Sequence, residues 1–143
     1  MKLVSSFLLL FLVGCSLFYP KNDNHLLEYS EAFVKESEGK VSVKDVKKVQ
    51  IYFKTQDDAV GTCNYMTDVI EIDPTFFYTA TAKPRKTVIY HELGHCVCKR
   101  DHTMGQLNDA CPDSIMYYKV VNRKCLDKHW DYYMKEIYTG CKK

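Results

Sequence analysis

Residues 84–102 read PRKTVIYHELGHCVCKRDH, and this stretch contains the pattern whose spacing carries a chemical mechanism. His91 and His95 are four residues apart, so on a helix they lie on one face and can bind the same metal ion. Glu92 lies beside them as a candidate general base. Apolar residues recur at helical spacing around the motif, and Pro84 suits a first helical turn. The stretch therefore predicts a helix over 84–97 and a catalytic zinc site on it.

A second motif follows further along the chain, where residues 111–118 read CPDSIMYY. With it the chain resembles the metzincin metallopeptidases, whose long motif HExxHxxGxxH/D is followed by a methionine turn. Residues 114–118 are similar to that turn, and Met116 matches its methionine. The resemblance implies that Met116 packs below the metal as a hydrophobic floor.

The resemblance also implies a role for a tyrosine. Tyr118 stands two residues after Met116, where astacin-like and serralysin-like metzincins place a tyrosine that reaches the metal or the transition-state oxyanion. A phenol at that place can donate a hydrogen bond to charge that develops only during the reaction. Tyr118 is therefore a candidate catalytic residue, with Tyr117 as the alternative.

The third metal ligand is the point at which the sequence departs from the family motif. Asp101 lies ten residues after His91 and His102 lies eleven residues after it. Small bacterial metzincins of the snapalysin type use an aspartate followed by a histidine, which resembles this pair, but their glycine corresponds here to Cys98. Imidazole is the commoner zinc ligand, so we expect His102 to bind the metal after a one-residue insertion in the turn. Asp101 is the alternative, and the residue that does not bind is expected to orient a ligand.

The segments around the motif predict a mixed α/β (α+β) domain in which a short twisted sheet is backed by a helix. Gly39 is placed to end the first helix, and Pro74 closes the strand region. The resemblance implies that 61–66 form an edge strand that pairs with extended substrate, and an interior hairpin is the alternative reading. The predicted elements are helices at 26–37, 84–97 and 125–139, strands at 46–54, 61–65 and 68–73, a short helical turn or loop at 76–82, and a loop at 103–114.

The first residues have the build of a secretion signal. Lys2 precedes an apolar run from 3 to 13, and residues 12–15 read LVGC. These four residues resemble a bacterial lipobox, which implies lipid attachment at Cys15 and, with Ser16 next, an outer-membrane or cell-surface location. We expect 1–15 to be the signal peptide, 16–24 a tether and 25–143 one domain.

Six cysteines follow Cys15, an even number that predicts disulfides in an exported chain. The sequence leaves their connectivity open. Cys96 and Cys98 lie on different faces of a helix, so each is expected to bond a distant cysteine. Cys125 and Cys141 bracket the last predicted helix, so both of its ends are expected to be crosslinked. The six are Cys63, Cys96, Cys98, Cys111, Cys125 and Cys141.

The expected function is that of a zinc-dependent endopeptidase, monomeric and held outside the cytoplasm by a lipid anchor, with proteins or peptides as substrates. The net charge of +2 implies no nucleic-acid partner. The alternative is a non-catalytic surface lipoprotein that binds a partner and holds a structural zinc through four protein ligands. A third hypothesis takes the third ligand from a later helix, with Glu136 as the candidate. The sequence does not indicate which peptide bonds are cut or how activity is controlled.

Overall fold

The computed structural model describes residues 22–141. The predicted signal peptide, the lipidation site at Cys15 and the tether up to residue 21 lie outside this range. The described chain is a mixed α/β domain with five helices and one three-stranded sheet, which confirms the predicted fold class. The helices are α1 (Asn24–Glu36), α2 (Val43–Val46), α3 (Pro74–Thr79), α4 (Ala82–Cys96) and α5 (Arg123–Glu136), and the strands are β1 (Gln50–Phe53), β2 (Gly61–Asn64) and β3 (Val69–Ile72).

The strands lie in the order β1-β3-β2. β1 and β3 are parallel, with Ile51 opposite Ile70, and β2 pairs antiparallel with β3, with Cys63 opposite Ile70. Only β3 has a partner strand on both sides within the described chain, so β2 is an edge strand, as the resemblance implied. Its free edge can therefore accept an additional strand.

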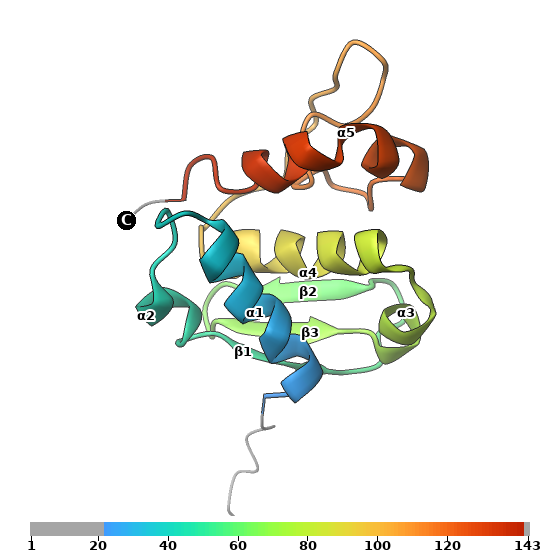
Figure 1. Cartoon of the computed structure of the whole chain (residues 1–143). Coiled ribbons are helices and arrows are strands. Elements are labelled where there is room, and N and C mark those ends of the chain that lie inside the picture. The colour runs from blue at the N-terminus through green and yellow to red at the C-terminus, as the bar shows by residue number, and fades with distance from the viewer. Residues whose placement is uncertain (1–21, 142–143) are drawn as a thin grey trace, which may run out of the picture.

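Helix α4 is the central element of the domain. Figure 1 shows it between the sheet and α5, and it contacts β2, β3, α1 and α5. Its burial matches this position, because nine of its fifteen residues are buried. The apolar side chains that it contributes include Val88, Ile89 and Leu93, which are at most 4 % exposed. The helix that carries the motif is thus fixed on several sides by packing.

Local signals explain the ends of most helices. The Asp23 side chain accepts a hydrogen bond from the backbone N–H of His25 and begins α1, and Asn122 caps α5 in the same way through Cys125 N–H. The left-handed position directly after the C-cap Ser37 is taken by Glu38, with a φ of 51°, and Gly39 follows it with a φ of 82°, one residue later than a glycine that ends a helix. The predicted strand at 46–54 begins too early, because Ser42 caps the short helix α2 and Val46 packs into the core from it.

All six cysteines form disulfides, which confirms the crosslinked domain predicted from their even number. As expected, Cys96 and Cys98 each bond a distant partner, and both ends of α5 are crosslinked. A chain with three such bonds is compatible with an exported protein. Between residues 22 and 141, no helix has the length and apolarity that a membrane span needs. The pairs are Cys63–Cys96, Cys98–Cys141 and Cys111–Cys125.

Candidate metal centre

The two histidines of the motif lie on one face of α4, as their spacing predicted. Their Nε2 atoms are 2.9 Å apart. His102 arrives from the segment after the helix, and its Nε2 lies 3.1 Å from both His91 Nε2 and His95 Nε2. Three imidazole nitrogens from two parts of the chain therefore converge on one point.

Asp101 does not join this group of donor atoms. It is exposed and borders the neighbouring cleft, close enough for its charge to favour the protonated form of His95. Of the two predicted third ligands, the structure therefore places His102, and not Asp101, with His91 and His95. Glu136, the ligand in the third hypothesis, forms an ion pair with Arg100 instead.

The contacts of the Nδ1 atoms show which tautomer His91 and His95 adopt. His91 Nδ1 lies 2.6 Å from the backbone oxygen of Ile115, and His95 Nδ1 lies 2.6 Å from that of Arg100. A carbonyl oxygen only accepts hydrogen bonds, so each Nδ1 carries the proton and each neutral ring has a bare lone pair at Nε2. Two such lone pairs 2.9 Å apart repel each other unless both face an electron-pair acceptor. The donor set therefore fits a metal cation.

The electrostatic surroundings favour the neutral rings. Burial lowers the pKa of His91 to about 4, and burial also lowers the pKa of His95. At neutral pH both rings are uncharged, which is the form that ligates metal. The environment of the two histidines thus keeps their lone pairs available.

Glu92 lies next to the histidines and is almost completely buried. Only 6 % of the residue is exposed, and burial raises the pKa of its carboxyl to about 8. Within residues 22–141 the carboxylate has no ion-pair partner. The first residue of β2 makes room for it: a Cβ on Gly61 would lie 3.0 Å from Glu92 Cγ and 3.1 Å from Oε1. A small residue at position 61 therefore sets the place of the carboxylate.

Met116 packs directly beneath the motif helix. It is fully buried, and a Cβ on Gly94 would lie only 2.6 Å from its Sδ. The glycine in the motif thus allows the methionine to approach the helix. The turn is held by two further contacts, from Met116 N–H to Ser114 Oγ at 2.9 Å and from Thr103 N–H to Met116 O at 2.9 Å.

A cleft of about 1080 Å³ opens beside the three histidines. The segment that contains the edge strand β2 borders it on one side, and the turn after Met116 borders it on another. Tyr118 lies along this cleft with 43 % of its surface exposed, and Tyr117 borders it as well. Hydrogen bonds with Tyr117 and Lys119 lower the pKa of Tyr118. The same cleft is therefore lined by the histidine motif, by the edge strand and by both candidate tyrosines.

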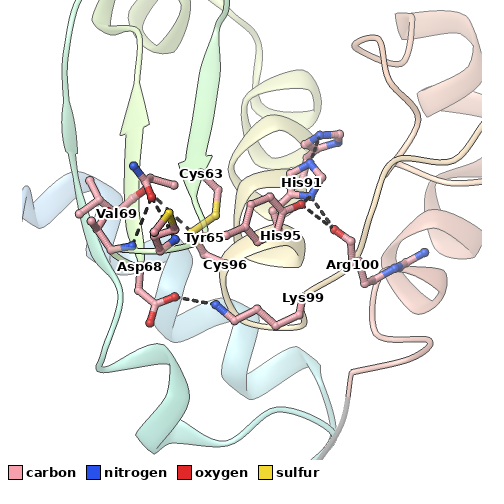
Figure 2. The surroundings of a disulfide bond; sticks show 12 residues. Cys63, Tyr65, Asp68, Val69, His91, His95, Cys96, Lys99 and Arg100 are labelled. Atoms are coloured by element: carbon pink, nitrogen blue, oxygen red, sulfur yellow. Dashed lines mark hydrogen bonds and ion pairs between the residues drawn. A yellow bond between two sulfur atoms is a disulfide. The ribbon is translucent and has the colours of Figure 1, made fainter.

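Sequence reasoning did not single out Tyr65 and Arg100 as site residues. The Tyr65 hydroxyl lies 2.6 Å from His95 Nδ1, and the Arg100 backbone oxygen forms a hydrogen bond with the same nitrogen (Figure 2). Tyr65 is thirty residues before His95 in the chain, and the chain contains 11 tyrosines, so no local pattern marks it. The hairpin between β2 and β3 brings it to the site.

A second group of possible ligands contains Asp109, Cys111 and His129. Its sulfur is already bonded in the Cys111–Cys125 disulfide. The Asp109 carboxylate accepts from Lys128 Nζ at 2.6 Å and His129 Nε2 at 2.7 Å. His129 is thus held by a carboxylate partner, and the group has no free thiolate to offer a metal.

Comparisons with known protein families and with curated proteins found no relative of this chain. No protein-family model matches the chain, and a search of curated proteins finds no match. The interpretation of the site therefore rests on its own geometry.

Proposed function

We propose that the protein is a zinc-dependent endopeptidase of the metzincin type. The observation that carries this proposal is the convergence of three imidazole nitrogens beside the buried carboxyl group of Glu92, at the edge of a cleft. A structural metal site has no need of such a carboxylate, because it closes its coordination with a fourth protein ligand. Between residues 22 and 141, the group holds three histidines and no fourth donor.

His91, His95 and His102 would hold the zinc ion. A zinc ion bound there supplies Lewis acidity and lowers the pKa of water to about 7. Glu92 takes a proton from the attacking water and delivers it to the leaving amine. Burial makes this carboxyl more basic than an exposed glutamate, which favours its uptake of the proton from water.

The cleft suits an extended peptide as the substrate. The free edge of β2 borders it, and backbone groups on an edge strand bind another strand with little regard for its side chains. Tyr118 borders the same cleft and, by the family resemblance, donates a hydrogen bond to the oxyanion that forms at the scissile carbonyl. Met116 supports the histidines from below as an apolar floor.

The site of action is proposed to lie outside the cytoplasm, at the outer membrane or the cell surface. Three disulfides support an oxidising environment. The LVGC sequence at residues 12–15 supports attachment through a lipid on Cys15. Mass spectrometry of the mature protein, with a Cys15→Ala variant as the control, tests this part of the proposal.

Cleavage of casein, an unstructured protein, tests the proposed activity. The oxidised, zinc-loaded protein is expected to cut casein, and both a chelator and Glu92→Ala are expected to abolish the cleavage. Glu31→Ala is the matched control, because it removes an exposed carboxylate from α1. Full activity in Glu92→Ala would show that the assigned mechanism is wrong.

A further inference from the structure

Tyr65 makes a contact that the proposed reaction does not require of it. It follows directly after β2, and its hydroxyl lies 2.6 Å from His95 Nδ1 and 3.1 Å from the backbone oxygen of Arg100. His95 Nδ1 in turn lies 2.6 Å from that oxygen. Figure 2 shows the phenol, the imidazole and the carbonyl meeting at one place.

The chemistry of the three groups fixes the direction of the hydrogen bonds. The Arg100 oxygen only accepts, so it receives the Tyr65 O–H and the His95 Nδ1–H. The phenol oxygen keeps a lone pair for the same Nδ1–H, which it shares with the carbonyl. His95 is therefore held in the tautomer that leaves Nε2 unprotonated, and its ring is turned so that Nε2 faces His91 and His102.

The hairpin that carries Tyr65 is itself fixed to the motif helix. The Cys63–Cys96 disulfide joins β2 to the residue directly after His95. Within the turn, the Asn64 side chain accepts from the backbone N–H of Met66 at 3.0 Å. An ion pair of 2.6 Å between Lys99 and Asp68 connects the far side of the hairpin to the turn after α4. Figure 2 shows the disulfide and the Lys99–Asp68 ion pair near the tyrosine.

The ring of Tyr65 adds a contact of its own. Its centroid lies 5.5 Å from that of His95 at an interplanar angle of 70°, an edge-to-face arrangement. Even so, Tyr65 is 45 % exposed and does not belong to the buried core. Loss of its hydroxyl alone therefore leaves the packing of the domain in place.

We propose that Tyr65 is a positioning residue for the metal ligand His95, and that its hydroxyl strengthens metal binding by helping the Arg100 carbonyl to hold the tautomer and the direction of that ring. This inference rests on the proposed metal site. Partners that orient a metal-binding histidine in this way change metal affinity by about 10–100-fold when they are removed. We therefore expect Tyr65→Phe to bind zinc about ten-fold more weakly or worse.

Zinc affinity of the full, oxidised chain tests the inference, measured by competition with a chromogenic chelator. Tyr52→Phe is the matched control, because its hydroxyl donates to Glu71 on β3 at 3.0 Å and neither residue borders the cleft. Tyr52→Phe is expected to bind zinc like the wild type, and Tyr65→Phe about ten-fold more weakly, with an unchanged melting temperature for the metal-free protein. The visible spectrum of the cobalt-substituted protein is expected to shift in Tyr65→Phe alone.

Equal zinc affinity and equal cobalt spectra for the two variants would overturn the assignment of Tyr65. If the wild type binds zinc tightly and Tyr65→Phe binds it weakly, but casein is not cleaved, the inference holds and the peptidase proposal fails. If the wild type binds no zinc, both the metal site and the role of Tyr65 are refuted.

Discussion

Replacement of Arg100 by methionine removes the charge that holds three parts of the domain together. Its guanidinium donates to the backbone oxygens of Glu136 and Ile137 at the end of α5, at 3.1 and 2.8 Å. It also forms an ion pair with the Glu136 carboxylate, which accepts a further hydrogen bond of 2.7 Å from Ser114 in the methionine turn. Arg100→Met therefore frees the turn and the end of α5 together.

The magnitude follows from the burial of the pair. The side chains of Arg100 and Glu136 are only 13 % and 14 % exposed, so water does not replace the lost partner. Removal of one member of a buried ion pair costs about 3–5 kcal/mol, because the other charge stays buried without a counterion. In a domain of this size 1 kcal/mol shifts the melting temperature by roughly 4 °C, so Arg100→Met is expected to melt about 12–20 °C lower.

Thermal unfolding of the oxidised, metal-free protein, followed by circular dichroism, measures this effect. Lys83→Met is the matched control, since it removes an ion pair with Asp127 whose side chains are 39 % and 53 % exposed, and a loss of less than about 1 kcal/mol is expected. The double variant Arg100→Met/Glu136→Met is expected to recover much of the lost stability. If Arg100→Met melts within about 2 °C of Lys83→Met, the reasoning about the buried pair is wrong.

Three further predictions concern the motif helix and its crosslinks. Burial raises the pKa of Glu92 from 4.5 to about 8, so the metal-free protein loses stability as the pH rises through this window. Glu92→Gln in excess chelator is expected to be more stable than the wild type by about 3–5 kcal/mol at pH 8 and equal to it at pH 4.5, and equal melting at pH 8 would contradict this. Gly61→Ala is expected to push Glu92 aside and to lower casein cleavage by about ten-fold or more at unchanged zinc affinity, whereas unchanged cleavage would show that the carboxylate tolerates the shift. Cys111→Ala/Cys125→Ala opens a disulfide with a sequence separation of 14 and is expected to lower the unfolding free energy by about 3 kcal/mol, measured in denaturant against the wild type.

The sequence was sufficient where the relevant geometry is local. His91, Glu92 and His95 are related by the period of a single helix, so their arrangement follows once the helix is predicted. The methionine turn was predicted from the resemblance, and Met116 does pack against the helix at Gly94. Both α1 and α5 were predicted, although each begins two residues earlier than expected, directly after the capping residues Asp23 and Asn122.

The choice between Asp101 and His102 depends on a turn that local rules do not predict. Lys99 takes a positive φ of 53°, a conformation that costs a residue with a side chain about 1–2 kcal/mol. The turn is closed by hydrogen bonds from Lys99 N–H to His95 O and from Arg100 N–H to Gly94 O, both 3.1 Å. Lysine therefore takes the conformation that glycine adopts freely, and the chain delivers His102 instead of Asp101.

The disulfide pairing and the contacts of Tyr65 depend on distant segments. Cys98 and Cys141 are separated by 43 residues, and Tyr65 and His95 by 30. Such partners meet only when the sheet, α4 and the C-terminal segment are assembled, and their spacing leaves no periodic signal in the sequence. Only the structure identifies them.

The central claim is that His91, His95 and His102 bind zinc and leave one position open for water. X-ray absorption at the zinc edge of the oxidised, zinc-loaded protein tests it directly. Three imidazole nitrogens and one further oxygen in the wild type, with one nitrogen lost in His102→Ala, are the result that we predict. Four protein donors around the zinc, or an unchanged spectrum in His102→Ala, would contradict the claim and favour a structural metal site.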